Sequence, residues 1–292
     1  MSKKKNQNTR PLPIPPAPIC FRHEAVRHNP VAPDGSRFSL VCVGHTRAKH
    51  GSVLPEDMTQ FVGIVWCLAG EIERRFDGHT ARLRPGWVSI VLPGTLMHFS
   101  VVSKTAEMRF FAVDGQDAEK RVFESGLWEG EFPSGPPPEG WLDILYERLT
   151  DAGWDGDDVA SSAAYDLLVR LGENVRRMTS DKQVYEARRI IHEQWKDKSL
   201  NVTKILKKLG VDRSTLSRRF LRVTGSSVLD YLLALRVQNA KRMLINTAKP
   251  IAEVGEAVGI DNPVYFSRLF AQRTGKSPRA FRLDPLGDDS KC

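Results

Sequence analysis

The stretch that decides the fold runs Ile251-Ala252-Glu253-Val254-Gly255-Glu256-Ala257-Val258-Gly259-Ile260 and continues Asp261-Asn262-Pro263-Val264-Tyr265-Phe266-Ser267-Arg268-Leu269-Phe270. The pattern predicts a short helix, a glycine turn and a second helix. Asn262 is suited to cap the second helix, and Pro263 to occupy its first position, where a missing N–H costs nothing. This order of elements is the layout of a helix-turn-helix unit.

A second copy of the same unit lies upstream. Leu216-Ser217-Arg218-Arg219-Phe220 aligns with Phe266-Ser267-Arg268-Leu269-Phe270, and Thr224-Gly225 with Thr274-Gly275, at an offset of 50 residues. Leu209-Gly210-Val211-Asp212 aligns with Val258-Gly259-Ile260-Asp261 at an offset of 49, so the first turn is one residue shorter. The chain therefore contains an internal repeat of one supersecondary unit.

Each copy repeats the same local chemistry. Gly210 and Gly259 stand where a helix ends in the left-handed region, and Asp212 can cap the first recognition helix as Asn262 caps the second. Leu216 with Phe220, and Phe266 with Phe270, are spaced i and i+4 and are expected to face a core. An exposed arginine or an apolar pair is by itself ordinary, but the recurrence of all these features makes a chance match implausible.

Charge is distributed unevenly along the chain. Residues 182–292 carry 22 Lys and Arg against 11 Asp and Glu, whereas residues 1–181 carry 21 against 24, and the net charge is +8. A basic C-terminal third fits a polyanionic partner, and we expect double-stranded DNA of a promoter or operator. The residues expected to contact DNA lie on or beside the second helix of each unit: Arg213, Ser214, Ser217, Arg218, Arg222, Asn262, Val264, Ser267, Arg268 and Arg273. Arginine recognises guanine, serine bonds base edges or phosphate, and valine contacts the thymine methyl group.

The N-terminal part has a different pattern. Short apolar runs separated by turn residues extend from about residue 36 to 114 and predict a β-barrel or jelly roll, followed by two amphipathic helices that either cover it or form a dimer interface. The predicted class is a two-domain α+β protein with an all-α C-terminal domain. The expected divisions are a disordered arm (1–18), a β-domain (19–178), a double helix-turn-helix domain (180–283) and a tail (284–292).

At the level of families, residues 180–283 resemble the DNA-binding domain of AraC/XylS-family transcription regulators. The resemblance rests on Ile251-Ala252-x-Val254-Gly255, Val258-Gly259-Ile260-Asp261, Tyr265-Phe266-Ser267-Arg268-x-Phe270, Gly275-x-Ser277-Pro278 and Phe281-Arg282, with Arg236, Ala240 and Leu244 on the connecting helix. It implies two units joined rigidly by that helix and entering successive major grooves. The chain departs from the family pattern at Leu206, Ile260 and Pro263-Val264, and the last departure suggests that the second helix reads few bases by hydrogen bonds.

Residues 36–114 are similar to the cupin-like sensor domain of the same family, through Ala69-Gly70-Glu71, Leu83-x-Pro85-Gly86 and Pro93-Gly94-x-x-x-His98. Metal-dependent cupins use a His-x-His cluster, which the sequence lacks, so we expect no metal, no cofactor and no enzymatic activity. A barrel can still hold a small molecule, such as a sugar, and the residues suited to line its pocket are Trp66, Arg74, Trp87 and His98. Which of them face inward depends on strand register.

These features together predict a cytoplasmic, ligand-responsive transcription regulator. The expected partners are DNA, a small-molecule effector, a second copy of the chain in a homodimer, and RNA polymerase if the protein activates; no membrane is expected, since the longest apolar run, residues 61–70, is too short to span one. Two alternatives remain open: a constitutive DNA-binding regulator whose N-terminal domain only dimerises, and a cupin enzyme with a nucleic-acid-binding domain.

Overall fold

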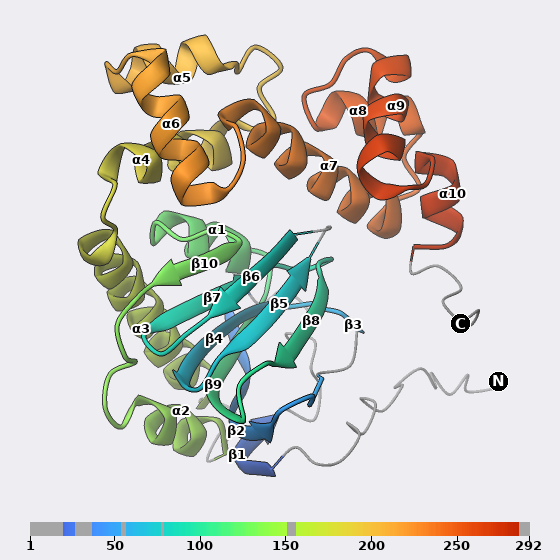
Figure 1. The fold of residues 1–292 in the computed structure, drawn as a ribbon. Helices are drawn as coiled ribbons and strands as arrows, with labels where there is room; N and C mark the ends of the chain where they lie inside the picture. The colour runs from blue at the N-terminus through green and yellow to red at the C-terminus, as the bar shows by residue number, and fades with distance from the viewer. Residues whose placement is uncertain (1–19, 27–36, 54–56, 77–78, 151–155, 286–292) are drawn as a thin grey trace, which may run out of the picture.

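The computed structural model describes residues 20–26, 37–53, 57–76, 79–150 and 156–285. A β-rich N-terminal part lies below a helical C-terminal part in Figure 1, and α3 leads from one to the other. The predicted arm, and residues 286–292 of the predicted tail, lie outside the described residues. The predicted two-domain class is confirmed.

Two antiparallel sheets form the N-terminal part. The six-stranded sheet has the order β1-β2-β9-β4-β7-β10, and the four-stranded sheet has the order β3-β8-β5-β6. Among the described residues the strands stay in two separate sheets and close no barrel, so the cupin-like detail remains a prediction. The strands are β1 (Cys20–Val26), β2 (Ser39–Lys49), β3 (Asp57–Met58), β4 (Val62–Ala69), β5 (Ile72–Phe76), β6 (His79–Leu83), β7 (Trp87–Val91), β8 (Leu96–Val101), β9 (Thr105–Asp114) and β10 (Gly130–Pro133).

Strand β4 is buried on both faces because the six-stranded sheet is covered on both sides. Successive side chains of a strand point to opposite faces. Ile64 and Trp66 accordingly join the core beneath the helices, whereas Val65 and Cys67 join the core between the two sheets. A strand enclosed in this way shows a continuous apolar run, which is why residues 61–68 stand out in the sequence.

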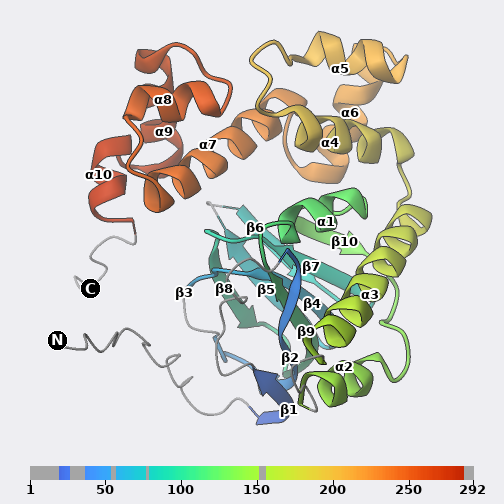
Figure 2. The same cartoon turned by 180° about the vertical axis from the view of Figure 1, so that it is seen from behind.

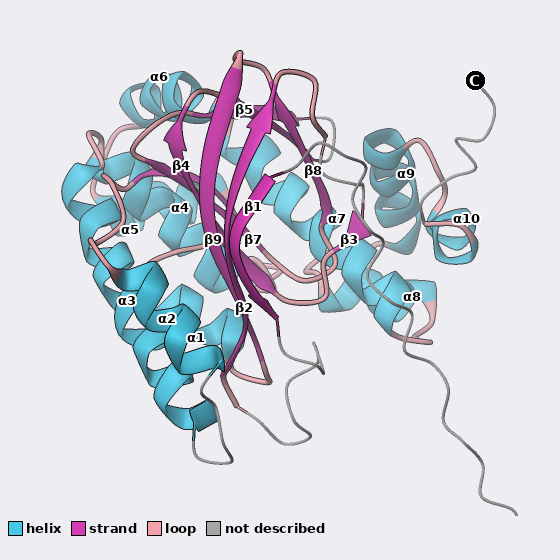
Figure 3. Ribbon diagram, turned by 90° about the horizontal axis from the view of Figure 1, so that it is seen from below, coloured by secondary structure: helices cyan, strands magenta, loops and turns pink. Residues whose placement is uncertain are grey.

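The helices α1 (Ala118–Glu124), α2 (Trp141–Thr150) and α3 (Gly156–Met178) belong to the N-terminal part. Helices α2 and α3 pack side by side on the six-stranded sheet, where Trp141 of α2 contacts Trp66 at a ring-centroid distance of 5.2 Å (Figures 2 and 3). Of the two roles expected for this helical pair, the structure of the single chain shows the covering role.

The C-terminal part is helical throughout its described length. Its helices are α4 (Lys182–Gln194), α5 (Val202–Leu209), α6 (Arg213–Thr224), α7 (Val228–Asn246), α8 (Ile251–Ala257), α9 (Pro263–Thr274) and α10 (Pro278–Leu283). Two separate cores form here, one around Phe220 and one around Phe270, and α7 contributes Leu232 to the first and Leu244 to the second. Helix α7 is therefore a spine shared by both.

Within the described ranges, none of the helices combines the length and the apolar composition that crossing a membrane requires.

Candidate nucleic-acid interface

The first helix-turn-helix unit consists of α5, a short turn and α6. Gly210 ends α5 at φ 64°, in the left-handed region that glycine adopts without strain. Asp212 caps α6 by accepting hydrogen bonds from the Thr215 amide at 2.8 Å and the Ser214 hydroxyl at 2.7 Å. The bonds from Thr215 and then Ser214 lower the pKa of Asp212 below its ordinary value of 3.8. The cap is thus a charged carboxylate at neutral pH, which suits a helix N-terminus.

The second unit repeats this construction with a turn one residue longer. Gly259 has φ 79°, and Asn262 caps α9 by accepting from the amides of Val264 at 3.0 Å and Tyr265 at 2.9 Å. Inside α8, a Cβ at Gly255 would lie 3.0 Å from the ring of Phe266, so glycine there lets the two helices approach closely. The predicted glycines, caps and Pro263 at the helix start are all confirmed.

Arg236 of α7 fixes the two units relative to each other. Its guanidinium is nearly fully buried and donates to the carbonyl oxygens of Trp195 at 2.9 Å and Asp197 at 2.8 Å. A Cβ at Gly259 would lie 3.0 Å from Arg236 Nη2, so the second unit's turn packs directly on this arginine. The helix-turn-helix units are consequently held by a buried polar joint as well as by the shared helix.

Each unit has a solvent-exposed helix face that matches the predicted reading surface. Helix α6 exposes Arg213, Ser214, Ser217, Arg218 and Arg222. At the second unit Asn262, Val264, Arg268 and Arg273 are exposed and Ser267 is partly exposed; Val264 reaches 77 %. Their outward orientation is a structural fact, whereas their contact with bases stays a prediction.

Some of these side chains already have partners within the chain. Asn262 and Ser214 take part in the caps, Arg273 pairs with Asp230 at 2.9 Å, and Arg222 lies 3.7 Å from Asp181. Arg268 lies over the Tyr265 ring at 5.9 Å. Arg218 has no partner of this kind among the described residues. Arg213, Ser217 and Arg218 are thus the polar groups that reach solvent most freely on α6.

The helical C-terminal domain is joined to the N-terminal domain by a buried chain of ion pairs that the sequence did not reveal. Glu129 accepts from Arg74 at 2.8 Å on the sheet side and from Arg242 of α7 at 3.0 Å on the other, and Gln238 of α7 also donates to it. The side chains of Arg74 and Glu129 are 0 % and 4 % exposed. We call Arg74, Glu129 and Arg242 the interdomain clamp. It ties the spine of both units to the β-domain.

An aromatic contact lies beside the clamp. His192 of α4 stacks on Trp128 of the N-terminal domain at 5.2 Å, and its Nε2 lies 2.9 Å from the hydroxyl of Tyr231 on α7. Burial, followed by the positive charges of Arg188 and Arg242, holds the pKa of His192 well below its ordinary value of 6.5. The ring is therefore neutral at neutral pH and packs as an aromatic group.

The four predicted ligand-pocket residues do not converge on one cavity. Trp66 lies under α2 with Phe111 and Trp141, on the sheet face opposite the second sheet. Arg74 is part of the interdomain clamp, and His98 lies on β8, partly buried. Trp87 is 37 % exposed and lines a groove between the two domains. These placements favour the groove over the sheet interior as a ligand site.

In the described part of the chain, no three His, Cys, Asp or Glu side chains are grouped so that they could hold a metal ion. His79 is the first residue of β6 and pairs with Phe76 in the four-stranded sheet. Cys67 has a free thiol in the core, and burial raises its pKa to about 11.

Two helix-turn-helix units on one shared helix define a double helix-turn-helix DNA-binding domain. A family model described as "Helix-turn-helix domain" matches residues 205–284. The chain is 33 % identical over 147 residues to the arabinose operon regulatory protein of Escherichia coli K12, covering 47 % of this chain and 50 % of that protein. It is 37 % identical over 101 residues to the Msm operon regulatory protein of Streptococcus mutans, covering 35 % and 36 %. The helical C-terminal part therefore contains a helix-turn-helix domain, and the chain is similar to these operon regulatory proteins.

The chain thus spans half or less of the length of these two relatives. Among solved structures it is similar to ToxT of Vibrio cholerae O395, with 11 % identity, a TM-score of 0.41 and coverage of 87 % of this chain and all of that one.

Proposed function

We propose that this protein is a sequence-specific, DNA-binding transcription regulator controlled by a small molecule. The observation that carries the proposal is the repeated unit, in which two capped helices, α6 and α9, present exposed polar and basic side chains from one rigid domain. Two such helices can contact two segments of one DNA molecule, and arginine forks supply base discrimination. The regulators of the arabinose and Msm operons, to which the domain is similar, support a role in transcription.

The interdomain clamp supports control by a ligand. A small molecule can shift the arrangement of a DNA-binding domain only if it binds two arrangements differently. Because Glu129 bonds both the β-domain and α7, any change at Glu129 is transmitted to the spine of both units. The proposal includes a small-molecule effector, a sugar among the candidates, and a homodimer that acts with RNA polymerase when it activates. It includes a cytoplasmic location and no enzymatic activity.

The proposal is tested by DNA selection followed by binding measurements. The full chain selects its preferred sequence from a random duplex pool, and affinity for that duplex is then measured for Arg218→Ala and Arg268→Ala. Loss of an arginine–guanine contact costs about 1–3 kcal/mol, which is roughly 5- to 150-fold in affinity. Arg170→Ala is the matched control, since Arg170 is also exposed but lies on α3 and pairs with Asp166. Failure to select any sequence would overturn the proposal.

The constitutive alternative is separated by a second measurement. If a ligand controls the protein, a bound effector alters its affinity for the selected duplex. A ligand that raises the melting temperature by mass action while leaving DNA affinity unchanged would favour an N-terminal domain without a regulatory role.

A further inference from the structure

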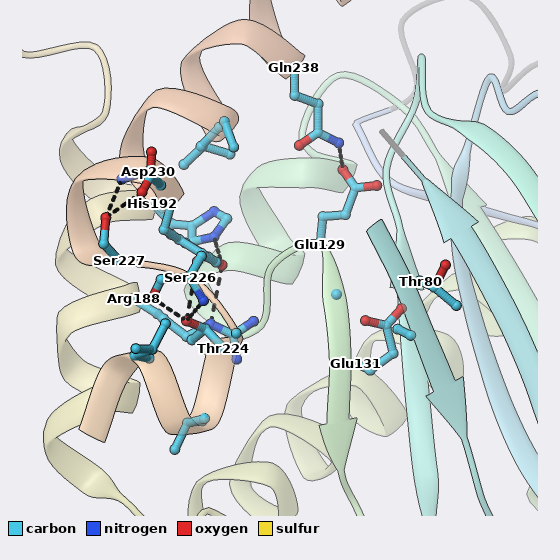
Figure 4. Close-up of a pocket in the computed structure, with 18 of the residues that line it drawn as sticks. Thr80, Glu129, Glu131, Arg188, His192, Thr224, Ser226, Ser227, Asp230 and Gln238 are labelled. Atoms are coloured by element: carbon cyan, nitrogen blue, oxygen red, sulfur yellow. Dashed lines mark hydrogen bonds between the residues drawn. The ribbon is translucent and has the colours of Figure 1, made fainter. Parts of the chain in front are cut away.

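A groove of about 730 Å³ lies between the two domains (Figure 4). Strands β6, β7 and β10 form one wall, with Thr80, Trp87 and Glu131, while α4 and the α6–α7 region form the other, with Arg188 and Tyr231. The volume lies within the range typical of small-molecule sites, about 300–1,000 Å³. By contrast, the gap between the two sheets near Ile72 and Phe99 holds only about 10 Å³.

Arg188 differs from the other arginines that line this groove. Arg273 pairs with Asp230 at 2.9 Å, and Arg82 lies 3.6 Å from Glu71. Arg188 forms no ion pair with any residue in the described part of the chain. One arginine of the groove is therefore left without a counter-charge.

The surroundings of Arg188 hold its guanidinium in one orientation but leave the Nη hydrogen-bond donors without acceptors among the described residues. Its Cζ lies over three aromatic rings, at 5.0 Å from Trp128, 5.1 Å from Phe132 and 5.5 Å from Tyr231, and its Nε donates to the Tyr231 hydroxyl at 3.2 Å. Ring faces stabilise the cation but offer no acceptor in the plane of the guanidinium. Neither Nη atom donates a hydrogen bond to the described chain. The planar fork is thus held in place with its donors available, which is the geometry that binds a carboxylate or phosphate in two-pronged fashion.

Three carboxylates line the same groove, and Asp230 among them pairs with Arg273. Glu129 is neutralised by Arg74 and Arg242, and Glu131 pairs with Arg74 at 2.9 Å. The pairing leaves a single uncompensated positive charge at Arg188. A monoanion matches that charge, whereas a dianion adds repulsion from the nearby carboxylates. Trp87, on the opposite wall, offers an exposed apolar ring to the rest of the ligand.

We propose that this groove binds a small organic monocarboxylate, with its acid group on the Arg188 fork and its apolar body along Trp87. The proposal deepens the ligand control proposed above and rests on it for its regulatory consequence, although not for the binding itself. Arg188 belongs to α4, Tyr231 to α7 and Trp128 to the N-terminal domain. A ligand seated here contacts both domains next to Glu129, so its binding is linked to the interdomain clamp.

The test compares benzoate with its neutral isostere benzamide on the full chain, by calorimetry and thermal melting. We expect benzoate to bind at least about 10-fold more tightly than benzamide and than inorganic phosphate, because it alone supplies one charged fork partner and an apolar body. Arg188→Met abolishes this preference. Arg189→Met is the matched control: Arg189 is the next residue on α4 and pairs with Glu186 and Glu193 outside the groove. Equal binding of benzoate and benzamide, tighter binding of phosphate, or unchanged binding in Arg188→Met would overturn the proposal.

A second variant guards against loss of folding in Arg188→Met. Arg188→Lys keeps a cation over the rings but replaces the fork by a point charge, and we expect benzoate affinity to fall about 10-fold at an unchanged melting temperature. The same proteins are tested on the selected duplex without benzoate. If the unmodified protein binds the duplex with full affinity but does not bind benzoate, the proposed carboxylate site is wrong and the proposed function stands. If the protein selects no DNA sequence, the proposed function itself is wrong.

Discussion

The two helix-turn-helix units share their construction and differ in what they present. Both close on a left-handed glycine and begin the recognition helix with a side-chain cap, Asp212 in one and Asn262 in the other. The first unit then exposes the polar pair Arg213 and Ser217, while the second begins with Pro263 and a highly exposed Val264. The same arrangement of glycine turn and side-chain cap therefore supports two different surfaces, and the first surface is the richer in hydrogen-bonding groups.

The units also differ in how they meet the N-terminal domain. The first lies against it through α4 and Tyr231, whose partners include His192 and Arg188, and this contact forms one wall of the interdomain groove. The second unit reaches it through the latter half of α7, where Arg242 joins Glu129. The unit expected to read more bases thus contributes most of this wall of the candidate ligand site, while the second unit contributes Arg273.

The largest effects are expected from emptying either core. Phe220→Ala and Phe270→Ala each remove a fully buried ring, which costs about 3–5 kcal/mol. Because the two cores are separate, hydrogen exchange should accelerate mainly in α5 and α6 for Phe220→Ala and in α8 and α9 for Phe270→Ala. Equal acceleration in both units from either variant would show that they form one cooperative core.

Breaking the interdomain clamp should have the next largest effect. Glu129→Gln leaves two buried arginines without their shared carboxylate and is expected to destabilise the folded chain by about 3 kcal/mol, measured by denaturant unfolding. Glu119→Gln is the matched control, because Glu119 also reaches Arg242 but its side chain is half exposed. A small effect of Glu129→Gln, equal to that of the control, would mean that the clamp does not hold the domains.

Removing the cap of the second unit tests whether its simpler surface still depends on the same local chemistry. Asn262→Ala leaves the amides of Val264 and Tyr265 without their acceptor and should cost about 1 kcal/mol in thermal unfolding. The exchange of those two amides should increase. No change in either would contradict the role of Asn262 as a cap.

The smallest effect on stability is expected at His192 and only at acidic pH. His192 has a folded-state pKa below its ordinary value of 6.5, so the folded protein binds fewer protons there than the unfolded chain. The contribution of neutral His192 to the free energy of unfolding is fully present above about pH 6.5 and is lost as the pH falls from there toward the folded-state pKa. His192→Gln should remove this part of the pH dependence of the melting temperature between about pH 7 and pH 5. An identical pH profile in the variant would contradict a buried neutral histidine.

The helical part was largely predictable because its signals are local. The glycines, caps and i, i+4 core pairs each act within about one turn of helix, and Pro263, predicted to occupy the first position of the second helix, begins α9. The β-region predicted for about residues 36–114 contains β2 to β9. Strand β6 lies within this region although exposed Thr80 and Arg82 interrupt its apolar pattern, whereas β10, which is only four residues long, lies outside it.

The features that the sequence did not predict depend on which face of a sheet a side chain occupies or on contacts between residues far apart in the chain. A strand buried on both sides shows no alternation, so nothing indicated that Trp66 points under the helices rather than between the sheets. The interdomain clamp joins Glu129 to Arg242 across 113 residues, and no periodic pattern relates them. The groove beside it arises from the packing of two domains, which local sequence does not specify.

If two unequal recognition helices read DNA, they should differ in the base preferences that they impose along the selected duplex, and the most direct test measures the preference at each position of that duplex. We expect Arg218→Ala to erase the preference at one or more base pairs in one half of the site, at about 1–3 kcal/mol each, and Arg268→Ala to have a smaller effect confined to the other half. Unchanged base preferences in both variants, or a larger loss from Arg268→Ala, would contradict this expectation.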